Sequence, residues 1–355
     1  MNTLFIYLLV ILTTTLVLYG RNVSKLRTFI AAFYLSLIFG LRIGIGNDYE
    51  NYVNMFYAIN VYDTGQLVTE PFFFLLNKLG FILFGNDGYH FVLFFCSFLQ
   101  MIFLLLAFRN FKCESFFGLC LFLSGIVFFL NNGVRQGVSI SIFIYSLTLL
   151  NVKSKKYFLT NLFGFIFHYS SLLFFVFPFI PWLNKSRNYF FYLAVWFISF
   201  ALYQTNFIGV FFQKAVSFIP YYGDIYLERI VNYKLDDSGS GLVVIFWYFI
   251  MLYIILYKEK LEPRLLNISV LGGLLYLAGV NFEMWERVFI PFFSVNFLVL
   301  SIIFKRSLLQ DKYNFFAGIF IVLMLFSLFS YQVIWDKNKN KASPFNHMLY
   351  NESTI

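Results

Sequence analysis

Runs of apolar residues recur along the whole chain, and they constrain its fold more than any other feature. The runs at 3–19, 91–108, 189–207, 242–257 and 288–304 approach the roughly 20 apolar residues that a helix needs to cross about 30 Å of hydrocarbon. Hydrophobic residues make up 60% of the sequence and charged residues only 12%, which excludes an ordinary soluble domain. The sequence therefore predicts an all-α, polytopic integral membrane protein.

Lysine and arginine are concentrated in one alternate set of the segments that connect these runs. The basic segments are 21–27, 109–112, 153–156, 185–187, 258–264 and 305–312. Because short cytoplasmic loops carry an excess of these residues, the pattern places the basic segments in the cytoplasm and the N-terminus outside. About ten membrane spans follow, near 3–20, 28–41, 91–108, 115–130, 137–151, 188–207, 242–257, 265–280, 288–304 and 313–332.

Two further apolar segments do not fit a simple crossing. Segment 71–84 is short and carries Asn77 and Lys78, which favours an interfacial or re-entrant helix on the outer face. Segment 158–183 lies between two basic loops, so it has to enter and leave on the cytoplasmic side as a hairpin. Two arms of about 12 residues each reach only about 18 Å, which places residues 168–171 at a buried apex.

We expect a single transmembrane domain over residues 1–335, with external loops at 42–90 and 208–241, followed by a polar C-terminal tail at 336–355. In this topology four polar segments, 42–70, 131–136, 208–241 and 281–287, all face outside. The sequence thus predicts one external chamber where these segments meet.

Several common functional classes lack support in the sequence. The net charge is +9, but no basic stripe or recognition module accompanies it, so we expect no nucleic acid partner. The three cysteines, Cys96, Cys113 and Cys120, lack metal-ligand spacing, and no cluster of His, Asp or Glu has such spacing either. We therefore expect a reaction that needs no metal and no cofactor.

Short polar motifs follow one another between the apolar runs. They are Arg42 with Gly46-x-Asp48 and Tyr52, then Glu70-Pro71, then Asn132-x-x-Arg135-Gln136, then Phe167-His168-Tyr169-Ser170, then Arg287 before an aromatic-rich helix. In this order they resemble the EpsG family, which is similar in kind to the Wzy polymerases that assemble bacterial surface polysaccharides. The resemblance extends over about residues 30–305.

The resemblance implies a glycosyltransferase of the bacterial cytoplasmic (inner) membrane, with its active site facing the periplasm or exterior. Such an enzyme moves a growing glycan from polyprenyl diphosphate onto the non-reducing end of a new lipid-linked repeat unit. The product is an O-antigen, capsule or exopolysaccharide, and a chain-length regulator in the membrane is a possible partner. The chemistry requires groups that neutralise the leaving pyrophosphate, orient a sugar hydroxyl and accept its proton.

Arg135 is the first candidate for binding the diphosphate. It follows Asn131-Asn132-Gly133 at the outer end of one predicted helix and begins the next, where free backbone amides also favour anions. The planar guanidinium group suits phosphate geometry. The alternative is an arginine that extends to the membrane interface without binding a ligand.

Two other arginines are further candidates for the diphosphate. Arg287 either binds phosphate or forms an ion pair with Glu283, four residues earlier. Arg42 either binds phosphate or holds Asp48 through a turn that the glycines at 44–46 permit.

Three residues compete for the role of catalytic base: His168, Asp48 and Glu70. The ordinary pKa of histidine suits proton transfer, although a lone histidine on an apolar helix is more often a core residue. Asp48 is equally explained as the cap of a helix that begins at Tyr49. The sequence leaves the choice between the three open.

Aromatic residues near the predicted outer loops are candidates for sugar contacts. Tyr49 and Tyr222 are the two that we select, whereas an interfacial aromatic belt explains most of the other tyrosines. Two rival functions use the same kind of chain. One is a flippase for the lipid-linked oligosaccharide, and the other is a membrane acyltransferase that modifies glycans.

Overall fold

The computed structural model describes residues 3–20, 23–62, 70–149, 155–205, 207, 211, 241–280, 285–309, 314–334, 345 and 347–348. These residues form helices and their connections, and the only β-type pairing among them is an isolated bridge between Arg42 and His347. The predicted all-α class is confirmed. The chain divides into two compact units, of which unit 1 comprises residues 1–180 and 304–355 and unit 2 comprises residues 181–303. The single domain over 1–335 stays a prediction.

Several helices in the described part of the chain have membrane character. Three stretches are long and apolar enough to cross a bilayer, namely Pro71–Asn110, Val288–Leu309 and Phe315–Ile334. A fourth span is possible if the bent pair Glu114–Leu123 and Ile126–Asn132 counts as one. Five shorter apolar helices of 10 to 17 residues accompany them. The chain is therefore a membrane protein, whereas the count of about ten spans stays a prediction.

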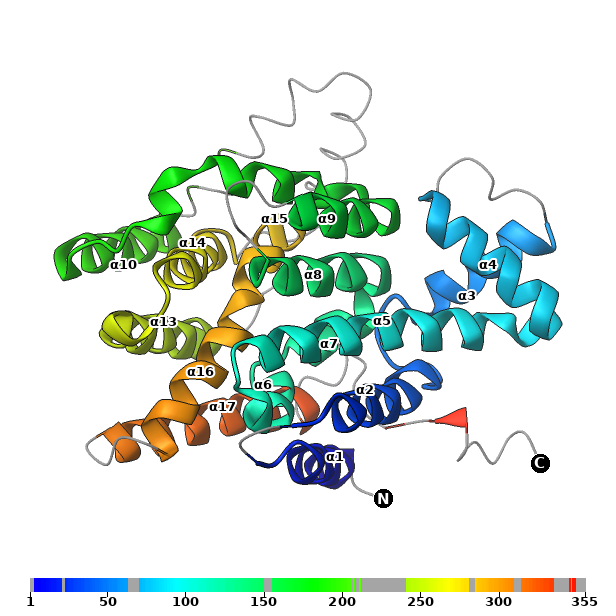
Figure 1. Cartoon of the computed structure of the whole chain (residues 1–355), viewed down its shortest axis with the longest axis horizontal. Helices are drawn as coiled ribbons and strands as arrows, with labels where there is room; N and C mark the ends of the chain where they lie inside the picture. Colours follow the sequence, from blue (N-terminus) through cyan, green and yellow to red (C-terminus); the bar gives the residue numbers. More distant parts are fainter. Residues whose placement is uncertain are drawn as a thin grey trace. The chain divides into compact units, whose positions relative to one another are not determined.

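Unit 1 is built around helix α5 (Gly88–Asn110). Its other helices and turns are α1 (Thr3–Val17), α2 (Lys25–Gly40), α3 (Tyr49–Asn60), α4 (Pro71–Phe84), η1 (Gly85–Asp87), η2 (Glu114–Phe116), α6 (Phe117–Leu123), α7 (Ile126–Asn132), α8 (Val134–Leu147), α9 (Lys155–Phe167), η3 (Tyr169–Phe179) and α17 (Phe315–Ile334). Helix α5 packs against α2 on one side and α8 on the other, and α9 packs against α8 (Figure 1).

Helix α4 has the bounds predicted for segment 71–84. Pro71 occupies its first position, where the missing N–H costs nothing. The helix packs on the start of α5, where Gly80 and Gly88 face each other so closely that a Cβ at Gly88 would lie 2.3 Å from the Gly80 carbonyl oxygen. Its position at the membrane interface stays a prediction.

The predicted span 115–130 is not one helix. Helices α6 and α7 meet at a bend of 73° around Ser124 and Gly125. Gly125 has φ +73°, a left-handed conformation that breaks the helix and that residues with a Cβ rarely adopt. The segment predicted as a span is therefore broken into two helices at this glycine, and its crossing of the membrane stays a prediction.

The predicted hairpin over 158–183 is present, with α9 as its first arm and the 3-10 helix η3 as its second. The Tyr157 hydroxyl donates to the Phe174 carbonyl over 2.6 Å, and the Phe158 ring contacts the rings of Phe175 and Phe179. These contacts show that η3 returns alongside α9. His168 lies at the turn between the arms, as predicted, with an extended backbone (φ −159°, ψ 120°).

Two residues from the end of the chain fold back onto unit 1. His347 pairs with Arg42 in the isolated bridge, and the backbone N–H of Met348 donates to the Leu41 carbonyl over 3.0 Å. The rest of the predicted polar tail at 336–355, apart from Phe345, lies outside the described residues.

Unit 2 is built around helix α14 (Pro263–Gly279). It also contains η4 (Pro181–Asn184), α10 (Tyr189–Gln204), α13 (Gly241–Leu256), η5 (Lys258–Lys260), α15 (Glu286–Phe293) and the start of α16 (Val295–Leu309). Helix α14 packs against α10, α13 and α15. Gly272 allows a close approach between the backbones of α14 and α15, since a Cβ there would lie 2.4 Å from the carbonyl carbon of Phe292.

Candidate functional site

A buried carboxylate joins three elements of unit 1. Glu70 precedes α4, and one of its oxygens, Oε1, lies 2.7 Å from Nδ1 of His168. The other oxygen, Oε2, accepts a hydrogen bond and an ion pair from Nη1 of Arg135, near the start of α8. Glu70 and His168 are 98 positions apart in the sequence, and Glu70 and Arg135 are 65 positions apart, so only the fold brings them together.

Pro71 explains the position of the Glu70 carboxylate. A residue before proline is kept out of the helical region, and Glu70 has an extended backbone (φ −60°, ψ 143°). Its carbonyl accepts the first helical hydrogen bond, from the N–H of Phe74 over 3.0 Å. Its side chain makes no capping hydrogen bond to α4, which leaves both carboxylate oxygens for Arg135 and His168.

The end of helix α9 determines the position of His168. The extended conformation of His168 ends the helix after Phe167 and directs the chain into η3. The fully buried Ser171 holds the turn, because its N–H and its hydroxyl both donate to the His168 carbonyl, over 3.1 and 2.9 Å. The imidazole is thereby held at the tip of the hairpin rather than inside either arm.

Arg135 lies in the first turn of α8, where backbone N–H groups have no partner within the helix. Arg135 also lies close enough to Tyr52, on α3, to interact with its hydroxyl. The guanidinium carbon also lies 5.4 Å from the centre of the Phe73 ring, within the range of a cation–π contact. Tyr52 is thus a fourth member of the site.

The electrostatics of the cluster favour an ionised carboxylate. Burial alone raises the pKa of Glu70, but the hydrogen bond with His168 and the charge of Arg135 outweigh it, and the pKa falls below the ordinary value of 4.5. An ionised Glu70 can only accept, so Nδ1 of His168 carries the proton that it donates. The other ring nitrogen, Nε2, is then the one that can accept a proton.

A hydrophobic core lies next to these polar groups. Phe73, Val134 and Phe167 are close neighbours in sequence of Glu70, Arg135 and His168, and all three belong to one buried cluster. The side chains of Arg135 and His168 remain 21% and 24% exposed, against 6% for Glu70. Packed residues therefore hold the three polar side chains in place, and those of Arg135 and His168 remain accessible to a ligand.

Arg42 is buried and makes its contacts with backbone carbonyls. It is 1% exposed, and its guanidinium nitrogens donate to the carbonyls of Phe39, Ile45 and Asn131. These contacts support a structural role and include no ion pair with Asp48. Arg42 as a phosphate ligand stays a prediction that its burial does not support.

The glycine turn after Arg42 has the expected conformation but a different partner. Gly44 and Gly46 have φ +65° and +97°, and the next backbone N–H, that of Asn47, donates to Oδ1 of Asn132 over 2.7 Å. A Cβ at Gly46 would lie 2.7 Å from the same oxygen. The turn therefore packs on the junction between α7 and α8, three residues before Arg135.

Asp48 and Tyr49 lie at the start of α3. The helix begins at Tyr49, but the Asp48 side chain makes no capping hydrogen bond and instead accepts from the Asn51 amide over 3.0 Å. Asp48 as a base stays a prediction, although no contact with Glu70 or His168 supports it. Tyr49 is only 5% exposed, so its ring has no free face for a sugar.

Two predicted residues cannot be placed in the site. Tyr222 and the side chain of Arg287 lie outside the described residues, although the backbone of Arg287 belongs to the first turn of helix α15. Tyr52 and Tyr89, by contrast, are not among the site residues predicted from the sequence. The spacing of Tyr49 and Tyr52, three apart on one helix, is the sequence signal for Tyr52. Nothing in the sequence indicates Tyr89.

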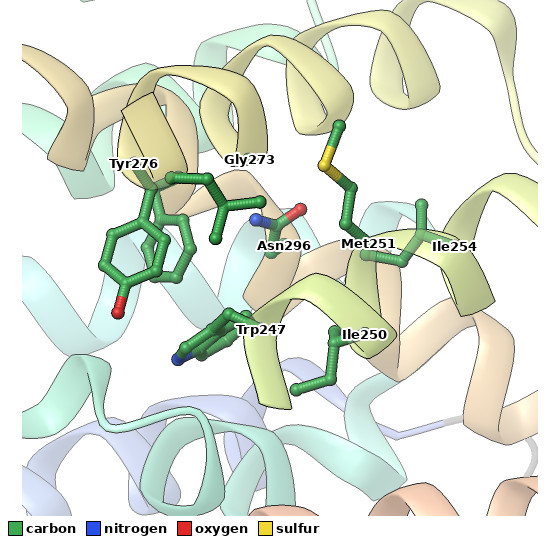
Figure 2. A pocket seen from close by; sticks show the side chains of 9 residues that line it. Trp247, Ile250, Met251, Ile254, Gly273, Tyr276 and Asn296 are labelled. Carbon is green, nitrogen blue, oxygen red and sulfur yellow. The ribbon is translucent and has the colours of Figure 1, made fainter. Parts of the chain in front are cut away.

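A small cavity in unit 2 offers no alternative site. It holds about 10 Å³ and lies among Trp247, Met251, Tyr276 and Asn296 (Figure 2). This volume accommodates one water molecule at most. Within the described part of the chain, no three His, Cys, Asp or Glu side chains gather in a way that could hold a metal ion.

Comparison with known proteins assigns the chain to a family. The EpsG family profile matches residues 25–347, which include Glu70, Arg135 and His168. No curated protein and no solved structure matches the chain. EpsG proteins are associated with Wzy-like polysaccharide polymerases. Since the match extends over nearly the whole sequence, this chain belongs to the EpsG family.

Proposed function

We propose that the protein is a polysaccharide polymerase that uses lipid-linked repeat units. In this reaction the growing glycan leaves polyprenyl diphosphate and is joined to the non-reducing end of a new lipid-linked repeat unit. The observation that carries the proposal is the Glu70 carboxylate, which holds a histidine and an arginine side by side at an accessible edge of a membrane protein. The family supports the same chemistry.

His168 is the proposed catalytic base. Glu70 accepts from Nδ1, fixes the tautomer and stabilises the imidazolium that forms when Nε2 takes a proton. The acceptor hydroxyl loses this proton as its oxygen forms a bond to the anomeric carbon of the donor. The bond between the anomeric carbon and the diphosphate oxygen breaks in the same step. Glu70 acts here through His168 and is a positioning residue.

Arg135 is the proposed ligand of the leaving diphosphate. Its pair with Glu70 uses Nη1, and a guanidinium group has further N–H donors in the same plane that suit phosphate oxygens. The dipole of helix α8, whose N-terminal end lies here, adds to the positive potential at this point. Binding to the diphosphate neutralises charge where it develops during bond cleavage.

The location of the reaction follows from the loop charges. We infer that the protein lies in the bacterial cytoplasmic membrane with the Glu70 cluster facing outward, because the basic loops favour the cytoplasm. Cysteines introduced at the exposed positions Asn51 and Ser186 test this orientation. A membrane-impermeant maleimide should label Asn51→Cys in whole cells and Ser186→Cys only after permeabilisation. The reverse result contradicts the orientation.

The bent pair of helices α6 and α7 favours a second candidate, a flippase for the same lipid-linked oligosaccharide. Transporters place broken helices at corresponding positions of two repeated halves. In the described part of the chain only one pair of helices is broken in this way, with a bend of 73°, and no second pair corresponds to it. Glu70, Arg135 and His168 also form a single cluster with the groups that the transfer reaction requires, so the polymerase explains more of the structure.

Deletion of the gene separates the candidates. Loss of the long glycan ladder, with a single repeat unit still displayed, supports the polymerase. Loss of every external unit indicates a flippase, and an intact ladder without acyl groups indicates an acyltransferase. A restored ladder with wild-type protein, but not with His168→Ala or Arg135→Lys, assigns the reaction to this site. The exposed neighbour Tyr169→Ala is the matched control and should restore the ladder.

A further inference from the structure

An aromatic group that the proposed mechanism does not use lies where the start of α5 meets α3. The centres of the Tyr89 and His90 rings are 4.0 Å apart, and the Tyr57 ring lies 6.4 Å from that of Tyr89. The ring of Phe56, which is fully buried, packs against the Tyr89 ring, with the ring centres 6.1 Å apart. The residues Tyr57, Tyr89 and His90 are half-buried, so each keeps some exposed surface.

Hydrogen-bonding groups surround these rings. The Tyr57 hydroxyl donates to the Asn86 carbonyl over 3.3 Å, and Nδ1 of His90 has no hydrogen-bond partner among the described residues. Two exposed carboxylates, Glu50 and Asp87, are close enough for their charges to act on the Tyr89 hydroxyl. The group therefore combines aromatic faces with an excess of acceptors.

Helix α3 connects this group to the Glu70 cluster. Tyr49 and Tyr52 are three residues apart and thus lie on one face of the helix. Tyr49 lies close enough to interact with Tyr89, and Tyr52 lies close enough to interact with Arg135. Neighbouring tyrosines on one face of α3 thus lie between the aromatic group and the arginine.

This combination has the chemistry of a sugar site. A pyranose ring has a C–H face, which packs on an aromatic ring, and a rim of hydroxyls, which donate to carboxylates. Ligand sites generally join aromatic surfaces with a few well-placed polar groups. The two carboxylates repel acidic sugars, because like charges in proximity are unfavourable.

We propose that Tyr57, Tyr89 and His90, with Glu50 and Asp87, bind the uncharged sugar at the non-reducing end of the acceptor repeat unit. This inference rests on the proposed polymerase function. It names the part of the substrate that the aromatic group holds while the Glu70 cluster carries out the transfer. The buried Tyr49 makes no sugar contact itself.

Binding of the glycan alone tests the proposal without the reaction. The probe is the oligosaccharide that mild acid releases from the lipid-linked repeat units of a strain lacking this gene. Its affinity for the purified protein in detergent is measured by isothermal titration calorimetry. We expect Tyr89→Leu to weaken binding about 3- to 10-fold, the range for the loss of one aromatic contact. Asp87→Asn should also weaken it.

Three variants serve as controls. Tyr89→Phe keeps the ring and should bind more tightly than Tyr89→Leu. Tyr331→Leu removes an exposed tyrosine from α17 and should bind like the wild type. A helical circular dichroism spectrum equal to that of the wild type shows that Tyr89→Leu is folded. If that variant misfolds, Asp87→Asn, on the exposed surface, decides the question instead.

The outcomes distinguish this proposal from the polymerase function. Equal affinities for wild type, Tyr89→Leu and Asp87→Asn overturn the sugar site and leave the rings as an interfacial aromatic belt. In that case a ladder lost on gene deletion still supports the polymerase. A terminal sugar that proves to be a uronic acid overturns the preference for uncharged sugars. An intact ladder in the deletion strain overturns the proposed polymerase function as well.

Discussion

Replacement of Glu70 by glutamine removes the charge that joins the candidate site while keeping the size of the side chain. The amide oxygen can still accept from one partner, but the amide nitrogen then faces the N–H of the other. Breaking a buried ion pair by removing one partner costs about 3 to 5 kcal/mol. The exposure of 21% at Arg135 and 24% at His168 lowers this value, and we expect a loss of about 1 to 3 kcal/mol at pH 7.

The pH dependence of this loss tests its electrostatic origin. The pKa of Glu70 lies below its ordinary value of 4.5 in the folded protein. The ionised carboxylate therefore contributes its full stability above pH 4.5, and this contribution disappears as the pH falls through the lower, folded-state pKa. Glu70→Gln lacks the contribution at every pH. The difference in stability between the two proteins should accordingly be constant from pH 7 to 5 and shrink below pH 4.5.

Unfolding in detergent provides the measurement. Heating is followed by circular dichroism at each pH. At pH 7 a fluorogenic maleimide reports exposure of Cys96, Cys113 and Cys120, which are all buried in unit 1. Glu50→Gln, at an exposed position on α3, is the control and should change stability by less than about 0.5 kcal/mol. A Glu70→Gln protein as stable as the wild type at pH 7, or a difference that persists unchanged at pH 3, refutes the reasoning.

Three further substitutions, with Gly44→Ala as a control for one of them, test the support of the site, each measured by the same thermal unfolding. Gly46→Ala should lower the free energy of unfolding by about 1 to 3 kcal/mol, because of the left-handed backbone of Gly46 and its contact with Asn132. Gly44→Ala, with open space around it, should lower it by only about 1 kcal/mol. Equal losses for the two variants contradict the role of the contact with Asn132. Arg42→Lys should cost about 2 to 4 kcal/mol, because one ammonium cannot reach three carbonyls, and an unchanged melting temperature opposes this. Gln100→Leu should cost about 1 to 3 kcal/mol, because its amide donates to the carbonyls of Leu130 and Val134 where α7 ends, and full stability means that these carbonyls find other donors.

The sequence predicts the elements of this protein well where a local signal defines them. The bounds of α4 follow from Pro71 and the apolar run behind it, and the hairpin around His168 follows from the two basic loops that flank it. The break at Gly125 was missed, because a single glycine inside an apolar run is compatible with a continuous helix.

The contacts of the site could not be predicted in the same way. The sequence presents Glu70 and His168 as competing bases, whereas the fold makes them a hydrogen-bonded pair. Arg42 resembles a ligand because a charge beside apolar residues usually marks function, and only the carbonyl of Asn131 shows it to be structural. Such assignments depend on pairings between distant segments, which hydrophobic periodicity does not encode.

The long sequence separation within the Glu70 cluster has a consequence for how the protein is made. Arg135 follows Glu70 by 65 residues, so at about 5 to 20 residues per second the ribosome supplies this partner roughly 3 to 13 s later. During that interval the nascent chain carries an unpaired acid beside its apolar segments. A polypeptide that stalls before α8 lacks Arg135 and cannot neutralise this acid through the ion pair of the finished protein.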